Sequence, residues 1–164
     1  MKNIFKLLML LVITLSATSC SDDEVAVETL DIIPANLHGK WKLEELNGAA
    51  IPETNYIYLD FHYNGTFKLY QHHDTMNPRY ITGTYNLVNN PKIGAVISGA
   101  YDFGNGKWNN EYIITDMLKS GSMIWTVRDD KAENKADLEV QKFVRVDEIP
   151  QDVLDAGKYD QDEE

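Results

Sequence analysis

Apolar and polar residues alternate through much of residues 37–146, and Gly, Asn and Pro interrupt the alternation at short intervals. The apolar positions are rich in aromatic and β-branched side chains, which is typical of strands that bury one face. This part of the chain has no internal repeat and no helix-period stretch of useful length. The pattern predicts eight strands, at residues 39–46, 56–62, 66–72, 79–87, 92–98, 110–116, 122–128 and 137–146.

Eight short strands connected in sequence favour an up-and-down barrel or a sandwich. Residues 37–146 are long enough for one domain. We expect an all-β fold, a small eight-stranded antiparallel barrel. After it comes an acidic C-terminal tail, residues 147–164, in which Pro150 and Gly157 mark the start and the end of a short helical turn. The final DQDEE is expected to be disordered.

The segment YIYLDFHYNGTFKLY, residues 56–70, predicts a hairpin because Asn64-Gly65 is a strong turn signal. A two-residue loop would mix apolar and charged side chains on each face, whereas a three-residue loop, 63–65, separates them. A slip of one residue turns every side chain to the other face, so the pattern selects the three-residue loop, with Gly65 in the left-handed conformation. The resulting pairs are Phe61–Phe67, Leu59–Leu69, Asp60–Lys68 and Tyr58–Tyr70.

Three histidines, His62, His72 and His73, lie near Asp74 and could suggest a zinc site. In the predicted hairpin, however, His72 lies opposite Tyr56, roughly 20 Å along the strand from His62. The adjacent His72 and His73 point to opposite faces. Because zinc needs three or four ligands at about 2 Å from one point, we expect surface histidines and no metal.

Known catalytic motifs are missing from the sequence, which has no HExxH, no GxSxG and no glycine-rich phosphate loop. The segment GNGKW at 104–108 lacks the spacing and the following helix, and it indicates a turn. An acid–base pair stays open, because such pairs meet in space and not in sequence. We expect a protein that is not an enzyme and needs no cofactor.

The N-terminus has the features of a secretory signal. Lys2 and Lys6 precede an apolar stretch, Leu7–Leu15, that is too short to span a bilayer core of about 30 Å. Small residues then precede Cys20, the single cysteine of the chain. The stretch resembles a bacterial lipobox, which implies that residues 1–19 are removed and that Cys20 carries the lipid. The alternative is an ordinary signal followed by an incidental thiol.

Acidic residues follow the cysteine directly. The segment Ser21–Glu24 resembles the signal that sends lipoproteins to the outer face of the outer membrane in one Gram-negative phylum. Charged residues would also simply keep a flexible tether, residues 20–36, solvated. We expect a protein that is lipid-anchored in the outer membrane and exposed at the cell surface.

The chain has 26 acidic and 15 basic residues, a formal net charge of −11. The excess lies at the ends, because residues 20–36 hold five acids and no Lys or Arg, and residues 147–164 hold eight acids and one Lys. Residues 37–146 are nearly neutral, with 13 acids and 12 basic residues. Without a basic stripe to neutralise phosphates, nucleic acid is not an expected partner.

Motifs at both ends of the predicted barrel resemble those of lipocalins and related calycin barrels. LHGKWKLEEL opens the first strand with Gly39-x-Trp41, and the last strand ends in KFVRV, with Arg145 where those barrels place the basic residue that covers the tryptophan. Between them, LDFHYNGTFKLY and ITGTYNL resemble small lipocalin-like domains of bacterial surface lipoproteins. The resemblance implies that Arg145 lies over Trp41 at the closed end of the barrel. Arg128 is the competing candidate.

An eight-stranded barrel can be filled by side chains or can hold one small ligand. Our leading hypothesis is that the protein binds a small, largely apolar ligand in the open end of the barrel. The residues expected to contact it are Trp41, Leu43, Phe61, Phe67, Tyr85, Tyr112 and Trp125. The further interior candidates are Ile57, Leu59, Leu69, Leu87, Ile114 and Val127, and together these side chains could instead fill the barrel.

The segment GAYDFGNGKWNN leads to a second hypothesis, a glycan-binding accessory protein. Tyr101, Phe103 and Trp108 would be exposed stacking platforms for sugar rings, unless they fold back over the barrel. Their hydrogen-bonding neighbours would be Asp102, Asn105 and Asn109. A third hypothesis is a structural partner in an outer-membrane complex, which would use Tyr58 and Tyr70 on the outside of a filled barrel. We expect a monomer.

Overall fold

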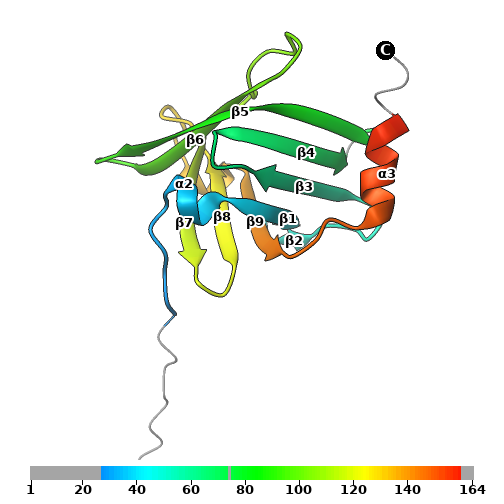
Figure 1. Cartoon of the computed structure of the whole chain (residues 1–164). Coiled ribbons are helices and arrows are strands. Elements are labelled where there is room, and N and C mark those ends of the chain that lie inside the picture. Colours follow the sequence, from blue (N-terminus) through cyan, green and yellow to red (C-terminus); the bar gives the residue numbers. More distant parts are fainter. Residues whose placement is uncertain (1–26, 74, 160–164) are drawn as a thin grey trace, which may run out of the picture.

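Figure 1 shows the computed structural model of the chain, which describes residues 27–73 and 75–159. The predicted signal peptide, Cys20, the beginning of the predicted tether, Asp74 and residues 160–164 lie outside the described residues. The wall of the molecule consists of β1 (Gly39–Leu46), β3 (Tyr56–Phe61), β4 (Thr66–His72), β5 (Arg79–Asn90), β6 (Gly94–Tyr101), β7 (Tyr112–Leu118), β8 (Ser122–Val127) and β9 (Val140–Val146). Outside this wall are α2 (Pro34–Leu37), β2 (Ala49–Ala50), a 3-10 helix (Lys135–Asp137) and α3 (Gln151–Tyr159).

The eight strands form a closed antiparallel barrel with up-and-down connections, which confirms the predicted fold class. Each strand from β3 to β9 pairs with the next one in sequence, and β1 pairs with both β3 and β9 and so closes the barrel. The short β2 only extends the sheet beside the end of β1. Because the strands alternate in direction, the start of β1 and the end of β6 lie at opposite ends of the barrel.

Strand boundaries differ most from the prediction around the turn between β5 and β6. Backbone pairing continues to Asn90 and Gly94, although polar residues end the alternation before that point. β6 therefore starts and ends later than predicted, at Gly94 and Tyr101. The last strand begins at Val140 instead of residue 137. The reason is the preceding 3-10 helix, in which the Asn134 side chain accepts a hydrogen bond from Ala136 N–H.

The β3–β4 hairpin has the predicted register. Gly65 adopts a φ of 80°, as the three-residue loop requires. The observed cross-strand pairs include Phe61–Phe67, Leu59–Leu69, Asp60–Lys68 and Tyr58–Tyr70. His72 pairs with Tyr56, so it lies at the far end of the hairpin from His62. Among the described residues, no three His, Cys, Asp or Glu side chains are grouped closely enough to hold a metal ion.

Large apolar side chains fill the barrel interior. Those exposed by less than 2% include Trp41, Phe61, Phe67, Phe143, Leu37, Leu43, Ile97, Ile114, Met117 and Met123. The Phe61 ring lies near the centre of this core, 5.0 Å from the Tyr85 centroid and 6.0 Å from that of Trp125. The alternation pattern had not identified Leu37, Ile97, Met117, Met123 or Phe143 as interior.

Helix α3 covers part of the outer face of the barrel beside β4 and β5 (Figure 1). Its Val153 packs with Tyr58 and Tyr70, which are only 6% and 8% exposed. The prediction that Gly157 ends this helix is wrong, because the helix continues to Tyr159. A Cβ at Gly157 would lie 3.3 Å from Cδ1 of Tyr70, so glycine lets the helix pack closely. Tyr58 and Tyr70 are therefore not available as the exposed surface that the third hypothesis required.

The end of the predicted tether is part of the folded unit. Leu30 N–H donates to Met117 O at 2.7 Å, and Lys119 Nζ lies 2.6 Å from a carboxylate oxygen of Glu28. Leu37, at the end of α2, is fully buried in the barrel core. Residues 28–36 thus differ from the flexible segment expected there, because backbone hydrogen bonds and apolar contacts hold them. Within the described residues, no helix has the length and apolarity needed to cross a membrane.

Stability should fall in alkaline solution because of Tyr70. Burial, with Tyr80 and Asp60 nearby, raises the pKa of Tyr70 from its ordinary value of 10 to about 12. Between these values the unfolded chain releases the Tyr70 proton while the folded protein keeps it, so the free energy of unfolding should decrease from pH 10 to about pH 12. Below this window the stabilisation is complete.

Urea unfolding as a function of pH measures this effect. Tyr70→Phe should reduce the alkaline loss, whereas Tyr63→Phe, at a residue that is 67% exposed, should leave it unchanged. Equal alkaline losses in the wild type and in Tyr70→Phe would contradict the assignment to Tyr70.

Candidate functional site

Arg145 lies over Trp41 at the closed end of the barrel. The two residues are cross-strand partners in β9 and β1, and the guanidinium carbon is 4.4 Å from the indole centroid. Arg145 also donates hydrogen bonds to the carbonyls of Asn36 and His38. Trp41 Nε1 donates to Leu37 O at 2.8 Å. The contact implied by the resemblance to lipocalins is confirmed.

Gly39 makes this contact possible. A Cβ at this position would lie 2.7 Å from Nη1 of Arg145, and the φ of Gly39 is 116°, a conformation that other residues rarely adopt. The glycine and the tryptophan of the Gly39-x-Trp41 motif therefore act together, since one leaves space for the guanidinium and the other presents its ring to it.

The side chains predicted to contact a ligand inside the barrel are mostly packed against one another. Exposure is 2% or less for Trp41, Leu43, Phe61, Phe67 and Trp125 and 9% for Tyr85, and Tyr112 is half-buried. The Trp125 centroid lies 4.9 Å from that of Phe143 and 5.3 Å from that of Tyr112. Burial raises the pKa of the Tyr112 phenol. These contacts place the predicted residues in the core.

The loop after β6 does not present three exposed rings, so that expectation is wrong. Trp108 packs edge to face on Phe67, with centroids 5.2 Å apart, and Tyr101 contacts the same ring at 6.3 Å. Both fold back against the core because their rings bury apolar area there. Phe103 alone of the three is exposed, at 91%, and its φ of 59° lies in the left-handed region.

The barrel wall is irregular where this loop returns to β7. The ladder between β6 and β7 ends with the pair Ile97–Tyr112, and the next contact is Trp108 N–H to Gly99 O at 2.9 Å. Between these two contacts β6 spans two residue steps, from 97 to 99, whereas the returning chain spans four, from 108 to 112. Because the returning chain has two residues more than the ladder can pair, the segment 109–111 bulges out of it. The Trp108 ring lies beside Gly99, where a Cβ would be 2.3 Å from Cε2 of the indole.

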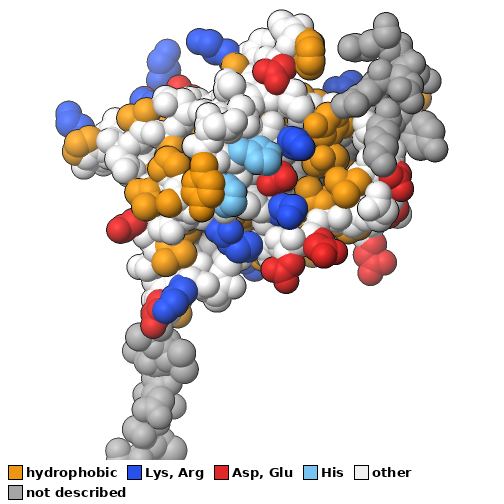
Figure 2. All heavy atoms as spheres, viewed as in Figure 1, with side chains coloured by type: hydrophobic (Ala, Val, Ile, Leu, Met, Phe, Trp, Pro, Cys, Tyr) orange, Lys and Arg blue, Asp and Glu red, His pale blue; other side chains and the backbone are white. Residues whose placement is uncertain are grey.

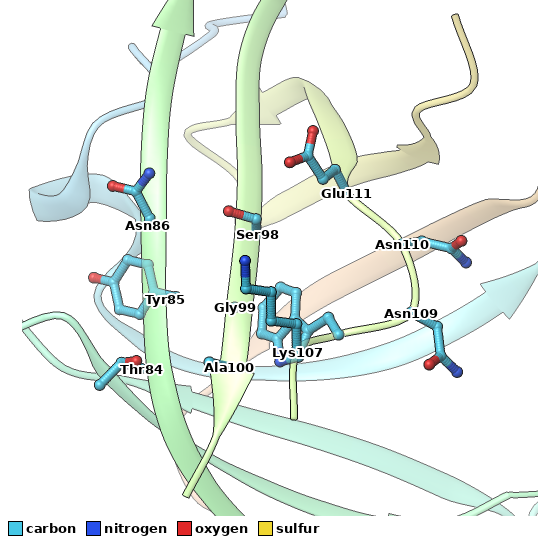
Figure 3. Close-up of a pocket in the computed structure, with 11 residues that line it drawn as sticks. Thr84, Tyr85, Asn86, Ser98, Gly99, Ala100, Lys107, Asn109, Asn110 and Glu111 are labelled. Carbon is cyan, nitrogen blue, oxygen red and sulfur yellow. The ribbon is translucent and has the colours of Figure 1, made fainter. Parts of the chain in front are cut away.

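The bulge borders a trough of about 330 Å³ on the outside of the barrel wall (Figure 3). This volume is at the lower end of the range for small-molecule sites. The lining comes from Thr84, Tyr85 and Asn86 on β5, from Ser98, Gly99 and Ala100 on β6, and from Lys107, Trp108, Asn109, Asn110 and Glu111 on the returning chain. The exposed Thr84 and Asn86 alternate with the buried Tyr85, so the trough lies outside the core.

The two charged residues of the trough have different environments. Lys107 makes no ion pair with any residue that the structure describes. Glu111, in contrast, accepts a hydrogen bond from Arg128 Nη1 at 2.8 Å, and Arg128 also binds Asp130 at 2.6 Å. Hydrogen bonding to Asp130 raises the pKa of Arg128. Arg128 is thus engaged here and is not the residue that covers Trp41.

Sequence reasoning had associated Trp108 and Asn109 with a site, but for exposed stacking and not for a trough. It had not identified the other polar lining residues, which are Thr84, Asn86, Ser98, Lys107, Asn110 and Glu111. The one local signal was the polar run KWNNE at 107–111, which follows a glycine-rich turn and interrupts the alternation before β7.

The strand pairing and the short C-terminal helix define the class of this protein as a closed eight-stranded antiparallel barrel. Comparison with solved structures finds similarity to the crystal structure of a lipocalin-like protein from Bacteroides uniformis. The two are 19% identical, the match covers 68% of this chain and 99% of that chain, and the TM-score is 0.43. No protein-family profile matches this chain, and no curated sequence matches it significantly.

Proposed function

We propose that this protein is a lipid-anchored surface protein that binds a small ligand without catalysing a reaction, and that the ligand occupies the trough beside β6. The observation that carries the proposal is the trough itself, a concave site of about 330 Å³ with several polar residues in its lining. The packed core argues against the barrel interior as the site, because a ligand there would have to displace fully buried rings.

The polar lining changes the expected ligand. Thr84 and Ser98 provide hydroxyls and Asn86 an amide, and an apolar ligand would leave these groups without partners. A largely apolar ligand, as first hypothesised, fits this trough less well than one with hydrogen-bonding groups of its own.

The position of the N-terminal segment supports attachment with the site facing outward. Glu28 and Leu30 bond to the end of β7, which lies at the closed end of the barrel. The loop that borders the trough follows β6 and lies at the opposite end. A lipid on Cys20 would therefore be attached on the side of the closed end of the barrel, and the trough would face away from the membrane.

The surface charge favours a neutral or weakly charged small molecule, and not a nucleic acid, as the ligand. Figure 2 shows that Lys and Arg side chains and Asp and Glu side chains are mixed over the viewed face. With residues 37–146 nearly neutral, binding to polyphosphate would lack its main electrostatic term. We propose a monomeric protein for which nucleic acid is not a partner.

Native mass spectrometry of the protein purified from its own cell tests the trough as the binding site. The wild type should carry an added small mass, and Ser98→Trp, which fills the trough from the outer face of β6, should lose it. Thr115→Trp, an equally large change at an exposed position of β7, should keep it. Retention of the mass in Ser98→Trp would contradict the proposal, as would a wild type that binds nothing even in a small-molecule extract of its cell.

Metabolic labelling with palmitate tests the anchor. Cys20→Ser should remove the label, because the thioether can form only at the cysteine, and the protein should leave the membrane fraction or remain unprocessed. Acyl chains contribute about 0.8 kcal/mol per buried CH2, so their loss removes the main membrane affinity. Equal label in the wild type and in Cys20→Ser would contradict lipidation at this residue.

A further inference from the structure

We infer that the ligand of the trough is a small sugar acid, a hydroxylated ring with one carboxylate, and that Lys107 binds the carboxylate. This inference rests on the proposed function, in which the trough is the binding site. Three features of the trough support it, namely its charge, its hydrogen-bonding groups and its aromatic wall.

The charge of the trough selects an anion. The Glu111 carboxylate pairs with Arg128, 2.8 Å away, which it shares with Asp130, whereas the Lys107 ammonium has no described partner. In Figure 3 the Lys107 side chain extends along β6 from the returning chain, at the level of Gly99. A ligand carboxylate at Lys107 would gain a charge-assisted hydrogen bond, which is stronger than a neutral one.

The same charge argues for a single carboxylate and against a phosphate. One flexible ammonium is the only cation among the lining residues. Phosphate sites generally use Arg or several converging backbone N–H groups.

The neutral polar groups select hydroxyls. Thr84 and Ser98 can each donate and accept one hydrogen bond or more, and the amide of Asn86 can do both as well. A ring with several hydroxyls matches such a mixture, because every hydroxyl is also both donor and acceptor. A ligand without them would leave these groups unpaired when it covers them, which is unfavourable.

One wall of the trough suits a flat or ring-shaped ligand. Trp108, which is half-buried against Phe67, lines this wall, and Gly99 and Ala100 add a strand surface almost without side chains. An indole offers a rigid apolar surface next to polar groups, to which the C–H face of a sugar ring is complementary. A volume of about 330 Å³ leaves room for one or two such rings.

Isothermal titration at low salt tests the inference with three probes, glucuronate, glucose and acetate. Wild-type protein should bind glucuronate roughly tenfold more tightly than glucose, the difference expected for one charge-assisted contact, and should not bind acetate measurably. Lys107→Gln should lower the affinity for glucuronate to that for glucose. Lys92→Gln, which removes a lysine from the β5–β6 turn outside the trough, is the matched control and should have no effect.

The outcomes separate this inference from the proposed function. Equal binding of glucuronate and glucose, or no effect of Lys107→Gln, would overturn the role of the charge and leave the trough as a binding site. Binding of none of the probes would overturn the sugar-acid class. The proposed function fails separately, if the Ser98→Trp protein still carries the bound mass.

Discussion

Replacing Phe61 with alanine should lower the free energy of unfolding by about 3–5 kcal/mol. The ring is completely buried, and Phe67, Tyr85 and Trp125 surround it with centroids 5.0–6.4 Å away. Removing the ring leaves a cavity that the neighbouring strands cannot close. The loss in the free energy of unfolding is therefore the sum of two terms, the lost burial of the apolar ring and the lost contacts around the cavity. Chemical denaturation with a two-state fit measures the difference.

Phe103→Ala is the matched control, because it removes the same ring from a residue that is 91% exposed. Its effect should stay within about 0.5 kcal/mol. If Phe61→Ala lost no more stability than Phe103→Ala, Phe61 would not be part of a packed core, and a wide cavity inside the barrel would be the better description.

Arg145→Ala should be the second large loss, about 2–3 kcal/mol. The guanidinium contributes a cation–π contact worth roughly 0.5–2 kcal/mol, and it also binds the carbonyls of Asn36 and His38. Its removal should detach the segment 34–38 from the barrel floor. Arg128→Ala deletes the same side chain from a surface ion-pair network and should have a much smaller effect.

A double-mutant cycle isolates the contact with the indole. Trp41→Phe and Arg145→Ala should show a coupling above about 0.5 kcal/mol, as residues in contact do. Additive losses would mean that Arg145 acts through the carbonyls alone and that the indole contact contributes nothing.

Two features of the fold could be predicted because short sequence patterns determine them. In the β3–β4 hairpin, Asn64-Gly65 sets the turn, and only one register separates Phe61 and Leu59 from Asp60. At the closed end, Arg145 and Trp41 occupy facing positions of the last and first strands, which any closed antiparallel barrel of this order makes neighbours.

Other features depend on departures from regular pairing, which alternation cannot show. Met117 and Met123 are fully buried, but the ladder between β7 and β8 shifts at Asp116, which has a φ of 47°. The trough likewise depends on the bulge at 109–111 and on the close approach of Trp108 to Gly99, nine residues away. Tyr58 and Tyr70 alternate as an exposed face would, and only the packing of α3 makes them buried.

The three tryptophans of the chain can test directly whether the barrel core is filled and the proposed ligand binds outside it. Trp108 lines the trough, whereas Trp41 and Trp125 are buried in the core at 1% and 2% exposure. Fluorine NMR of protein labelled with 5-fluorotryptophan should give one signal for each. On addition of glucuronate the Trp108 signal should shift, the Trp125 signal should respond less, and the Trp41 signal should stay in place, and laurate should move none of them. A saturable shift of Trp41 with laurate, and an unchanged Trp108 with glucuronate, would contradict the account.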